Sequence, residues 1–325
     1  VMRILINKAK ANPKRILFPE GDNVKILRAA QVLLEEGIAI PVLIGDEADI
    51  RAKIAELHLL EMDQVEIVDP ATNGNLERYI NELFRLRQRK GITLAEARRL
   101  ITKSRNYLGA MMVHLGDADT LLSGIEHHYP DTIRPAMEVI GKQDGISKVH
   151  GTYMMVTKKE VVFFADTTVN IEPSAEELAE IALLTARKAQ QLDVDPRVAM
   201  LSFSNFGSTK HPLSLKVQKA TALIKERDPA LVVDGEMQAN VALDPELSAK
   251  QFPFSALQGN ANVFIFPDLQ SGNICYKLLN KLGGAEAIGP ILMGMKKPIH
   301  VLQRGDDVAD IVNMAAVAVV DAQEQ

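Results

Sequence analysis

The chain has 325 residues, of which 47% are hydrophobic and 24% charged, a composition typical of one large globular domain or two of common size. Its formal net charge of -5 excludes a general nucleic-acid-binding surface, because binding a polyanion requires a clustered basic face. The single cysteine, Cys275, permits neither an internal disulfide nor a cysteine-based metal site, and no apolar stretch is long enough to span a bilayer. We therefore expect a soluble cytoplasmic protein with no nucleic-acid or membrane partner.

The first segments have the pattern of a β-α-β unit. An apolar run at 15–20 predicts a strand, the segment 23–37 has helical periodicity, and 39–45 predicts a second strand. Further along, Thr93 and Glu96 have the spacing of a capping box, in which each side chain bonds the other residue's backbone amide. A helix is therefore expected to begin after Thr93.

A polar, glycine-rich stretch at 138–153 separates this block from a second one, so a domain boundary is expected near residue 146. In the second block strand-like and helical segments alternate, and Ser174 with Glu177 forms another capping-box pattern. This alternation is typical of an α/β fold with mainly parallel sheets. The strands are expected at 161–166, 197–204, 231–237 and 261–269, and a well-buried last helix, rich in alanine and valine, at 306–323.

Two loops that follow strands contain candidate binding residues. The segment 202–212 includes Ser204, Ser208 and a glycine, so its backbone amides can approach a phosphate at the start of the next helix. On the loop alone, a simple turn is the alternative and the commoner case. After the second such loop, Lys277 can meet a phosphate and Tyr276 can stack on a base, or both can belong to a solvated helix turn.

Acids and histidines give no metal-binding pattern. Asp166, Asp234 and Asp268 stand at the ends of apolar strands, where open α/β sheets bind ligands, although such residues also cap loops. His127 and His128 are adjacent and cannot share one helix face, which argues against a two-histidine metal site. No metal site is expected.

Taken in order, the segments resemble the phosphate acetyltransferase (phosphotransacetylase) family over essentially the whole chain. The resemblance implies two three-layer αβα domains, similar to isocitrate and isopropylmalate dehydrogenases, with acyl-CoA bound in an interdomain cleft. It also implies that the chain crosses back, giving domains at 1–146 plus 297–325 and at 147–296, with a homodimer formed through the second. The matching segments are RILFPEGD (15–22), RKGITLAEAR (89–98), GAMMVHLGDADTLLSG (109–124), DTIRPAMEVI (131–140), FADTTVNIEPSAEELAEIA (164–182), PRVAMLSFS (196–204), DGEMQANVAL (234–243), GNANVFIFPDLQSGNICYKL (259–278) and GAEAIGPILMGMKKPIHVLQRG (284–305).

Active members of that family have a Ser-Arg-Gly turn followed by an aspartate on a helix, and Arg304 and Asp310 occupy those positions here. The resemblance implies that the arginine faces the acyl phosphate and the developing oxyanion, while the aspartate takes the proton from the thiol of CoA. Arg87 and Arg134 also match arginines of the family.

Several positions depart from the family's pattern. Gln303 replaces the serine, His128 and Tyr129 replace two small hydroxyl residues, and Lys281 replaces an arginine whose bidentate fork a lysine cannot form. With these departures the chain resembles the phosphotransacetylase-like C-terminal domain of hybrid NADP-dependent malic enzymes. The start at Val1 fits a domain excised from such a protein.

The resulting hypothesis is a regulatory domain without transferase activity, which binds acetyl-CoA as an inhibitory effector of an attached malic enzyme half. That half would use NADP and a divalent metal to convert malate to pyruvate, whereas no cofactor is expected in this domain. One alternative is an active phosphate acetyltransferase. Another is a structural dimerisation module, which is disfavoured because cations turned toward an empty cleft would repel one another. The expected partners are CoA or acetyl-CoA, a second copy of the chain and the malic enzyme half. The expected binding residues are Arg87, His128, Tyr129, Arg134, Ser204, Ser208, Asn273, Tyr276, Lys277, Lys281, Gln303, Arg304 and Asp310.

Overall fold

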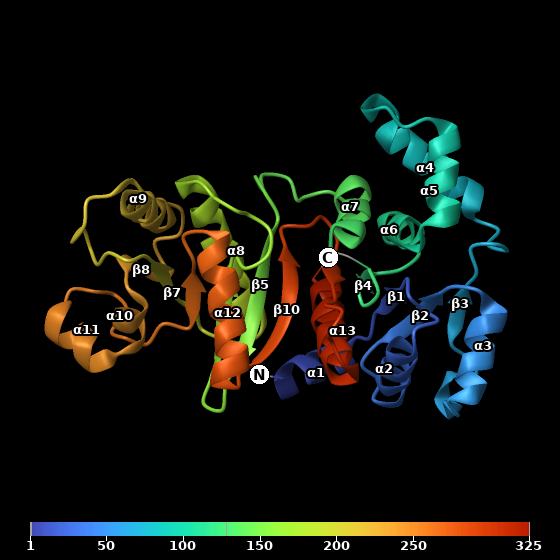
Figure 1. The fold of residues 1–325 in the computed structure, drawn as a ribbon, viewed down its shortest axis with the longest axis horizontal. Coiled ribbons are helices and arrows are strands. Elements are labelled where there is room, and N and C mark those ends of the chain that lie inside the picture. The colour runs from blue at the N-terminus through green and yellow to red at the C-terminus, as the bar shows by residue number, and fades with distance from the viewer. Residues whose placement is uncertain (1, 128, 325) are drawn as a thin grey trace. The chain divides into compact units, whose positions relative to one another are not determined.

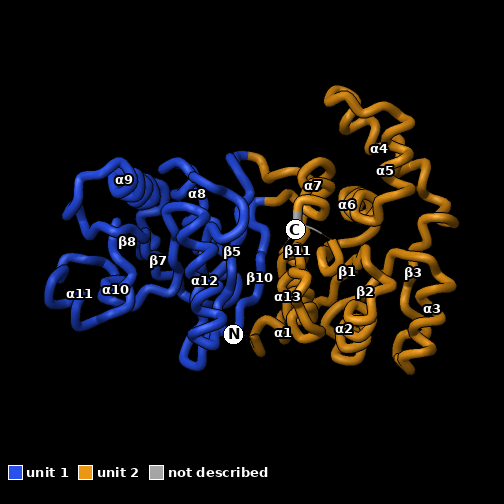
Figure 2. Tube along the Cα trace, viewed as in Figure 1, with its two compact units in different colours: residues 1, 145–294 blue, residues 2–144, 295–325 orange. Residues whose placement is uncertain are grey.

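The computed structural model describes residues 2–127 and 129–324, whose helices and strands are drawn in Figure 1. The chain divides into two compact units, which Figure 2 shows in different colours. The continuous unit comprises residues 145–294, and the discontinuous unit comprises residues 2–144 together with 295–325. Within the described chain, no helix is both long and apolar enough to cross a membrane.

The described sheet of the discontinuous unit is parallel throughout, with the order β11-β4-β1-β2-β3. In the centre, Arg15 of β1 is in register with Ile40 of β2, and Ile16 of β1 with Thr120 of β4. Because all five strands run the same way, their carboxyl ends meet at one edge, where open α/β sheets bind ligands. The strands are β1 (Arg15–Phe18), β2 (Ile40–Ile44), β3 (Glu66–Val68), β4 (Thr120–Ser123) and β11 (Ile299–Val301).

The last helix, α13 (Val308–Gln323), supplies much of this unit's core. It packs on β1 and β4 and against α1 and α2 (Figure 1). Its alanine and valine side chains are buried along most of its length, which confirms the prediction of a buried last helix. The other helices are α1 (Met2–Ala11), α2 (Val24–Glu35), α3 (Glu47–Glu56), α4 (Leu76–Arg87), α5 (Leu94–Lys103), α6 (Arg105–Leu115) and α7 (Tyr129–Val139).

The continuous unit has a mixed sheet with the order β10-β5-β6-β9-β7-β8. The four strands β6, β9, β7 and β8 are parallel, whereas β5 pairs antiparallel with both β6 and β10. The strands are β5 (His150–Val156), β6 (Val161–Ala165), β7 (Arg197–Leu201), β8 (Val232–Met237), β9 (Val263–Ile265) and β10 (Glu286–Met293). The helices are α8 (Ala175–Gln191), α9 (Pro212–Arg227), α10 (Ala239–Leu243), α11 (Pro245–Gln251) and α12 (Leu269–Gly283).

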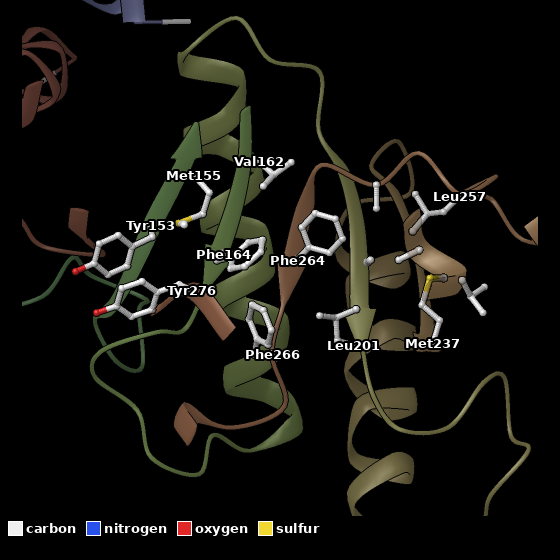
Figure 3. Packing of buried hydrophobic residues seen from close by; sticks show 14 of the residues in the cluster. Tyr153, Met155, Val162, Phe164, Leu201, Met237, Leu257, Phe264, Phe266 and Tyr276 are labelled. Carbon is white, nitrogen blue, oxygen red and sulfur yellow. The ribbon is translucent and has the colours of Figure 1, made fainter. Parts of the chain in front are cut away.

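Aromatic rings dominate one core of this unit, shown in Figure 3. The rings of Tyr153 and Tyr276 stack with centroids 4.1 Å apart, and Phe164 meets Phe266 edge-on at 5.1 Å. Such pairs contribute about 0.5–1.5 kcal/mol beyond the area they bury. The core therefore ties α12 to the strands β5, β6 and β9.

The predicted fold class, α/β with mainly parallel sheets, is confirmed, and each strand expected in the two blocks forms within the predicted range. Ser174 and Glu177 form the reciprocal capping box. Thr93 does cap α5, accepting the Glu96 amide, but the Glu96 carboxylate instead pairs with Arg99 at 2.7 Å. The Glu96 carboxylate, which the capping-box pattern predicts to accept the Thr93 backbone amide, therefore binds Arg99 instead.

Candidate functional site

Arg87 and Arg134, two of the predicted binding residues, line one cavity of about 480 Å³ in the discontinuous unit. Lys90 and Arg99 add two further cationic side chains to its wall, against three acids. Basic groups that surround a cavity of this size suit a phosphate-bearing ligand. The other lining residues are Ile92, Glu96, Leu100, Ser104, Tyr107, Asp131, Pro135 and Glu138.

Arg87 is the most constrained of these cations. Its side chain is only 16% exposed, and its Nη2 lies 3.4 Å from Oε1 of Glu138. Its Nε is buried and has no hydrogen-bond partner among the described residues. A buried N–H group without an acceptor is costly, so the pairing with Glu138 leaves this guanidinium incompletely satisfied.

Glu138 also holds the phenol of Tyr107, whose hydroxyl donates to Glu138 Oε2 at 2.7 Å. Burial raises the pKa of Tyr107, and the adjacent Glu138 carboxylate raises it further, so the phenol stays protonated at neutral pH. Glu138 thus links α6 to α7 and orients Arg87 on α4. Arg134, on α7, is exposed.

A second cavity, of about 440 Å³, shares Ser104 and Asp131 with the first. It lies at the carboxyl end of β1 and is lined by Glu20, Asp22 and Arg105 among others. Burial alone would raise the pKa of Asp22, but the Arg105 guanidinium, 2.6 Å away, lowers it. Sequence reasoning missed these residues, although the position of the FPEGD segment at the end of the first strand was an available signal.

Arg304 lies on the turn between β11 and α13, and its side chain is exposed. No described residue forms an ion pair or hydrogen bond with its guanidinium. Asp310 lies in the first turn of α13, where its Oδ2 accepts the Asp307 amide at 2.9 Å as half of a capping box. The turn therefore presents a cation with no partner among the described residues, and the helix that follows holds the Asp310 carboxylate in a fixed orientation.

The loop at 202–212 was a candidate phosphate site, but a side chain of the protein occupies its amides. Oε1 of Glu236, from β8, accepts the Gly207 amide at 2.7 Å and the Ser204 hydroxyl at 3.0 Å. Ser208 Oγ accepts the Asn205 amide at 3.0 Å. Glu236 is 1% exposed, so a buried carboxyl group of the protein already binds this loop.

The three aspartates that the sequence placed at strand ends act as backbone acceptors, although Asp234 lies inside β8. Asp166 accepts five hydrogen bonds, among them those from the amides of Gly151 and Asn170. Asp268 caps α12 through the Ser271 amide, and Asp234 accepts the Ala256 amide and pairs with a lysine. Of the two interpretations that the sequence left open, loop capping describes all three.

The predicted residues of α12 differ in accessibility. Tyr276 is buried, and the face of its ring is covered by Tyr153 in the core of Figure 3, so no open face remains for a base. Asn273 donates to the carbonyl of Thr167 at 3.0 Å. Lys277 and Lys281 are exposed. Of the remaining candidates, His128 lies outside the described residues, and Tyr129 is described only as the first residue of α7.

Residues 1–319 match the family model of phosphate acetyl/butaryl transferases. The chain belongs to this family.

Relatives of known name and solved structures agree with the family assignment. The chain is 43% identical to the phosphate acetyltransferase of Nitratidesulfovibrio vulgaris over 99% of its own length, but it spans only 45% of that protein. It is 42% identical to the phosphate acetyltransferase of Thermoanaerobacterium thermosaccharolyticum, with 99% of each chain covered. A phosphotransacetylase structure from Streptococcus pyogenes superposes with a TM-score of 0.94 at 40% identity, covering 99% of this chain and 97% of the other.

These comparisons overturn the malic enzyme hypothesis. Relatives matched along the whole chain are named phosphate acetyltransferase, so the expectations of an inhibitory effector domain, of oxidoreductase chemistry with NADP and of a malic enzyme partner are wrong. The hypothesis relied on Gln303, His128, Tyr129 and Lys281. At about 40% identity more than half of all positions differ from such a relative, so four replacements do not indicate a lost activity. Arg304 and Asp310, to which the resemblance assigns the transfer chemistry, are both present.

Proposed function

We propose that this protein is a phosphate acetyltransferase, which converts acetyl-CoA and phosphate to acetyl phosphate and CoA. The observation that carries the proposal is the 303–310 turn, where the unpaired guanidinium of Arg304 precedes the oriented carboxylate of Asp310. The names of relatives matched over the whole chain support the same reaction. CoA is a substrate in this proposal, so no resident cofactor is invoked.

In the forward direction a phosphate oxygen attacks the thioester carbonyl carbon, the carbon–sulfur bond breaks, and CoA leaves as a thiolate that takes up a proton. In reverse, Asp310 accepts the proton of the CoA thiol, the thiolate attacks the carbonyl carbon of acetyl phosphate, and the bond between that carbon and the bridging oxygen breaks to release inorganic phosphate. In both directions negative charge develops on the carbonyl oxygen. A guanidinium such as Arg304 stabilises that charge in the transition state.

The cavity lined by Arg87 and Arg134 is proposed to bind the phosphate groups of CoA. The position of Arg87 in the cavity wall supports this role, because guanidinium groups bind phosphate oxygens through charge-assisted hydrogen bonds. Contacts of Asn273, Lys277 and Lys281 with the nucleotide stay predictions from the sequence. Roles for Tyr129, Ser204, Ser208 and Gln303 stay predictions from the resemblance.

The test is release of free thiol from acetyl-CoA in the presence of phosphate. Arg304→Gln is expected to lower kcat about 100- to 1,000-fold, because it removes charge stabilisation from the transition state. Asp310→Asn is expected to lower kcat about 100-fold or more. Arg87→Gln is expected to raise KM for CoA in the reverse reaction about tenfold or more, with a smaller effect on kcat.

Arg85→Gln is the matched control, because Arg85 lies on the same helix as Arg87 but is 66% exposed and paired with Glu82. It is expected to leave both constants unchanged. Absence of thiol release by the unmodified protein, or full activity in Arg304→Gln, would contradict the proposal.

The homodimer also stays a prediction. Three apolar side chains of α12, Ile274, Leu278 and Leu282, are spaced four residues apart on one helix face and are 56%, 53% and 83% exposed. An exposed stripe of this kind is typical of a surface that meets another chain. Light scattering on the purified protein would give its mass in solution.

A further inference from the structure

The turn before α13 contains one acid that differs from its neighbours. Asp306 is 9% exposed, whereas Asp307, the next residue, is exposed. Asp306 Oδ2 accepts the Gln303 amide at 2.7 Å, and the Asp306 amide donates to the Gln303 carbonyl at 3.0 Å. Two hydrogen bonds thus close a four-residue turn whose exposed apex is Arg304 and Gly305.

The charged groups around Asp306 come from two helices. Lys25 of α2 donates to the Asp306 carbonyl oxygen at 2.5 Å, and Asp307 and Asp310 approach from the start of α13. Burial raises the pKa of Asp306 to about 7; Asp310 and Asp307 raise it as well, while the Gln303 amide and Lys25 oppose the shift. Near neutral pH the carboxyl therefore exists in both protonation states.

We propose that Asp306 is a positioning residue for Arg304: its ionised carboxylate holds the Gln303 amide and thereby fixes the turn that presents the guanidinium. The inference rests on the proposed transferase function, in which Arg304 must face the reacting carbonyl. A hydrogen bond to an ionised acceptor is about twice as strong as one to a neutral acceptor. Protonation of Asp306 therefore loosens the turn, and transfer slows on the acid side without loss of CoA binding.

The first measurement is kcat and KM between pH 5.5 and 9 for three variants. Asp306→Asn keeps the shape but not the charge, and is expected to lower kcat at pH 8 about threefold to tenfold and to remove the fall in kcat around pH 7. Asp306→Ala, which has no acceptor, is expected to lower kcat further, with KM for CoA within about twofold of the unmodified protein. Asp307→Asn is the matched control, because asparagine caps a helix as well as aspartate does and the same charge is removed one residue away.

The second measurement does not depend on turnover. With glutamine-selective ¹⁵N labelling, the Gln303 amide resonance is expected to shift with pH around 7 and to stop shifting in Asp306→Asn. A Gln303 amide that does not titrate, or an equal loss of kcat in Asp306→Asn and Asp307→Asn, overturns the positioning role. If the amide titrates but the unmodified protein releases no thiol, the coupling between Asp306 and the turn is supported and the proposed function is overturned.

Discussion

His150 is a buried histidine whose hydrogen bonds define its tautomer. The Thr185 hydroxyl donates to the Ile181 carbonyl at 2.7 Å, so the His150 Nε2–H must be the donor to Thr185 Oγ1, 3.3 Å away. Nδ1 is buried and has no partner among the described residues. A proton on Nδ1 would therefore have no acceptor, in a side chain with no solvent exposure. Burial accordingly lowers the pKa of His150 to about 4, although Asp166 and Glu180 oppose the shift.

This shift predicts a loss of stability in mild acid. Above pH 6.5 the histidine is neutral in both the folded and unfolded states and adds no pH dependence. Between pH 6.5 and about 4 the unfolded chain binds a proton that the folded state does not, so the free energy of unfolding falls by roughly 3 kcal/mol. His150→Leu is expected to remove this part of the slope in urea unfolding measured from pH 7 to 4.

The matched control for that measurement is His211→Asn, which replaces an exposed N-cap histidine by another good capping residue. It should leave the pH dependence as in the unmodified protein. An unchanged slope in His150→Leu would show that the acid sensitivity has another origin.

At the scale of elements, the loop at 202–212 depends on Glu236, which is distant in sequence. A glutamine in place of Glu236 can still accept hydrogen bonds from Gly207 and Ser204 through Oε1. Its Nε2, however, would take the buried position of Oε2, which has no partner among the described residues, so a buried N–H donor would have no acceptor. We expect Glu236→Gln to lower the free energy of unfolding by about 1–3 kcal/mol and to speed amide exchange at Gly207. The control is Glu226→Gln on the exposed surface of α9, with a change within about 0.5 kcal/mol. Unaltered exchange at Gly207 would contradict the role given to Glu236.

The same loop shows which features of the structure could be predicted from the sequence and which could not. Periodicity located α13 and the strands β1, β2, β6, β7, β8 and β9, and local spacing located the Ser174 cap, because those signals depend on residues close in sequence. It did not locate the strands β3, β4, β5, β10 and β11. The carboxyl group that binds the 202–212 loop comes from Glu236 of β8, about thirty residues away, and the ring that covers Tyr276 comes from β5. Contacts between residues distant in sequence produce no periodic pattern. The predictions for Ser204 and Tyr276 therefore could not include Glu236 and Tyr153, the residues that contact them.

Arg87 and Arg134 illustrate the opposite case. Family resemblance selected both residues without any geometry, and the structure brings them to one cavity. Two features could not be predicted: the buried Nε of Arg87, which has no partner among the described residues, and the hydrogen bond from the Gln303 amide to Asp306 in the turn that contains Arg304. Each depends on burial created by elements from distant parts of the chain.

At the scale of the whole molecule, the discontinuous unit requires both ends of the chain. Its sheet lacks the edge strand β11, and its core lacks α13, unless residues 295–325 are present. The two segments at which the chain leaves and re-enters this unit lie side by side, since Lys142 pairs antiparallel with Met295 and the Lys296 amide donates to the Gly141 carbonyl. A linker of a few residues can therefore join residue 144 to residue 295.

We expect the fragment 145–294 to fold alone, because its six strands and the aromatic core around Tyr153 and Tyr276 lie within it. A chain of 2–144 joined to 295–325 by a short glycine-rich linker is expected to fold as well, whereas 2–144 alone is not. Far-UV circular dichroism and urea unfolding test all three, and each folded fragment should show one cooperative transition with a slope proportional to its size. A cooperative transition for 2–144 alone would mean that β11 and α13 are dispensable to that core, and an unfolded 145–294 would mean that the continuous unit is not an independent folding unit.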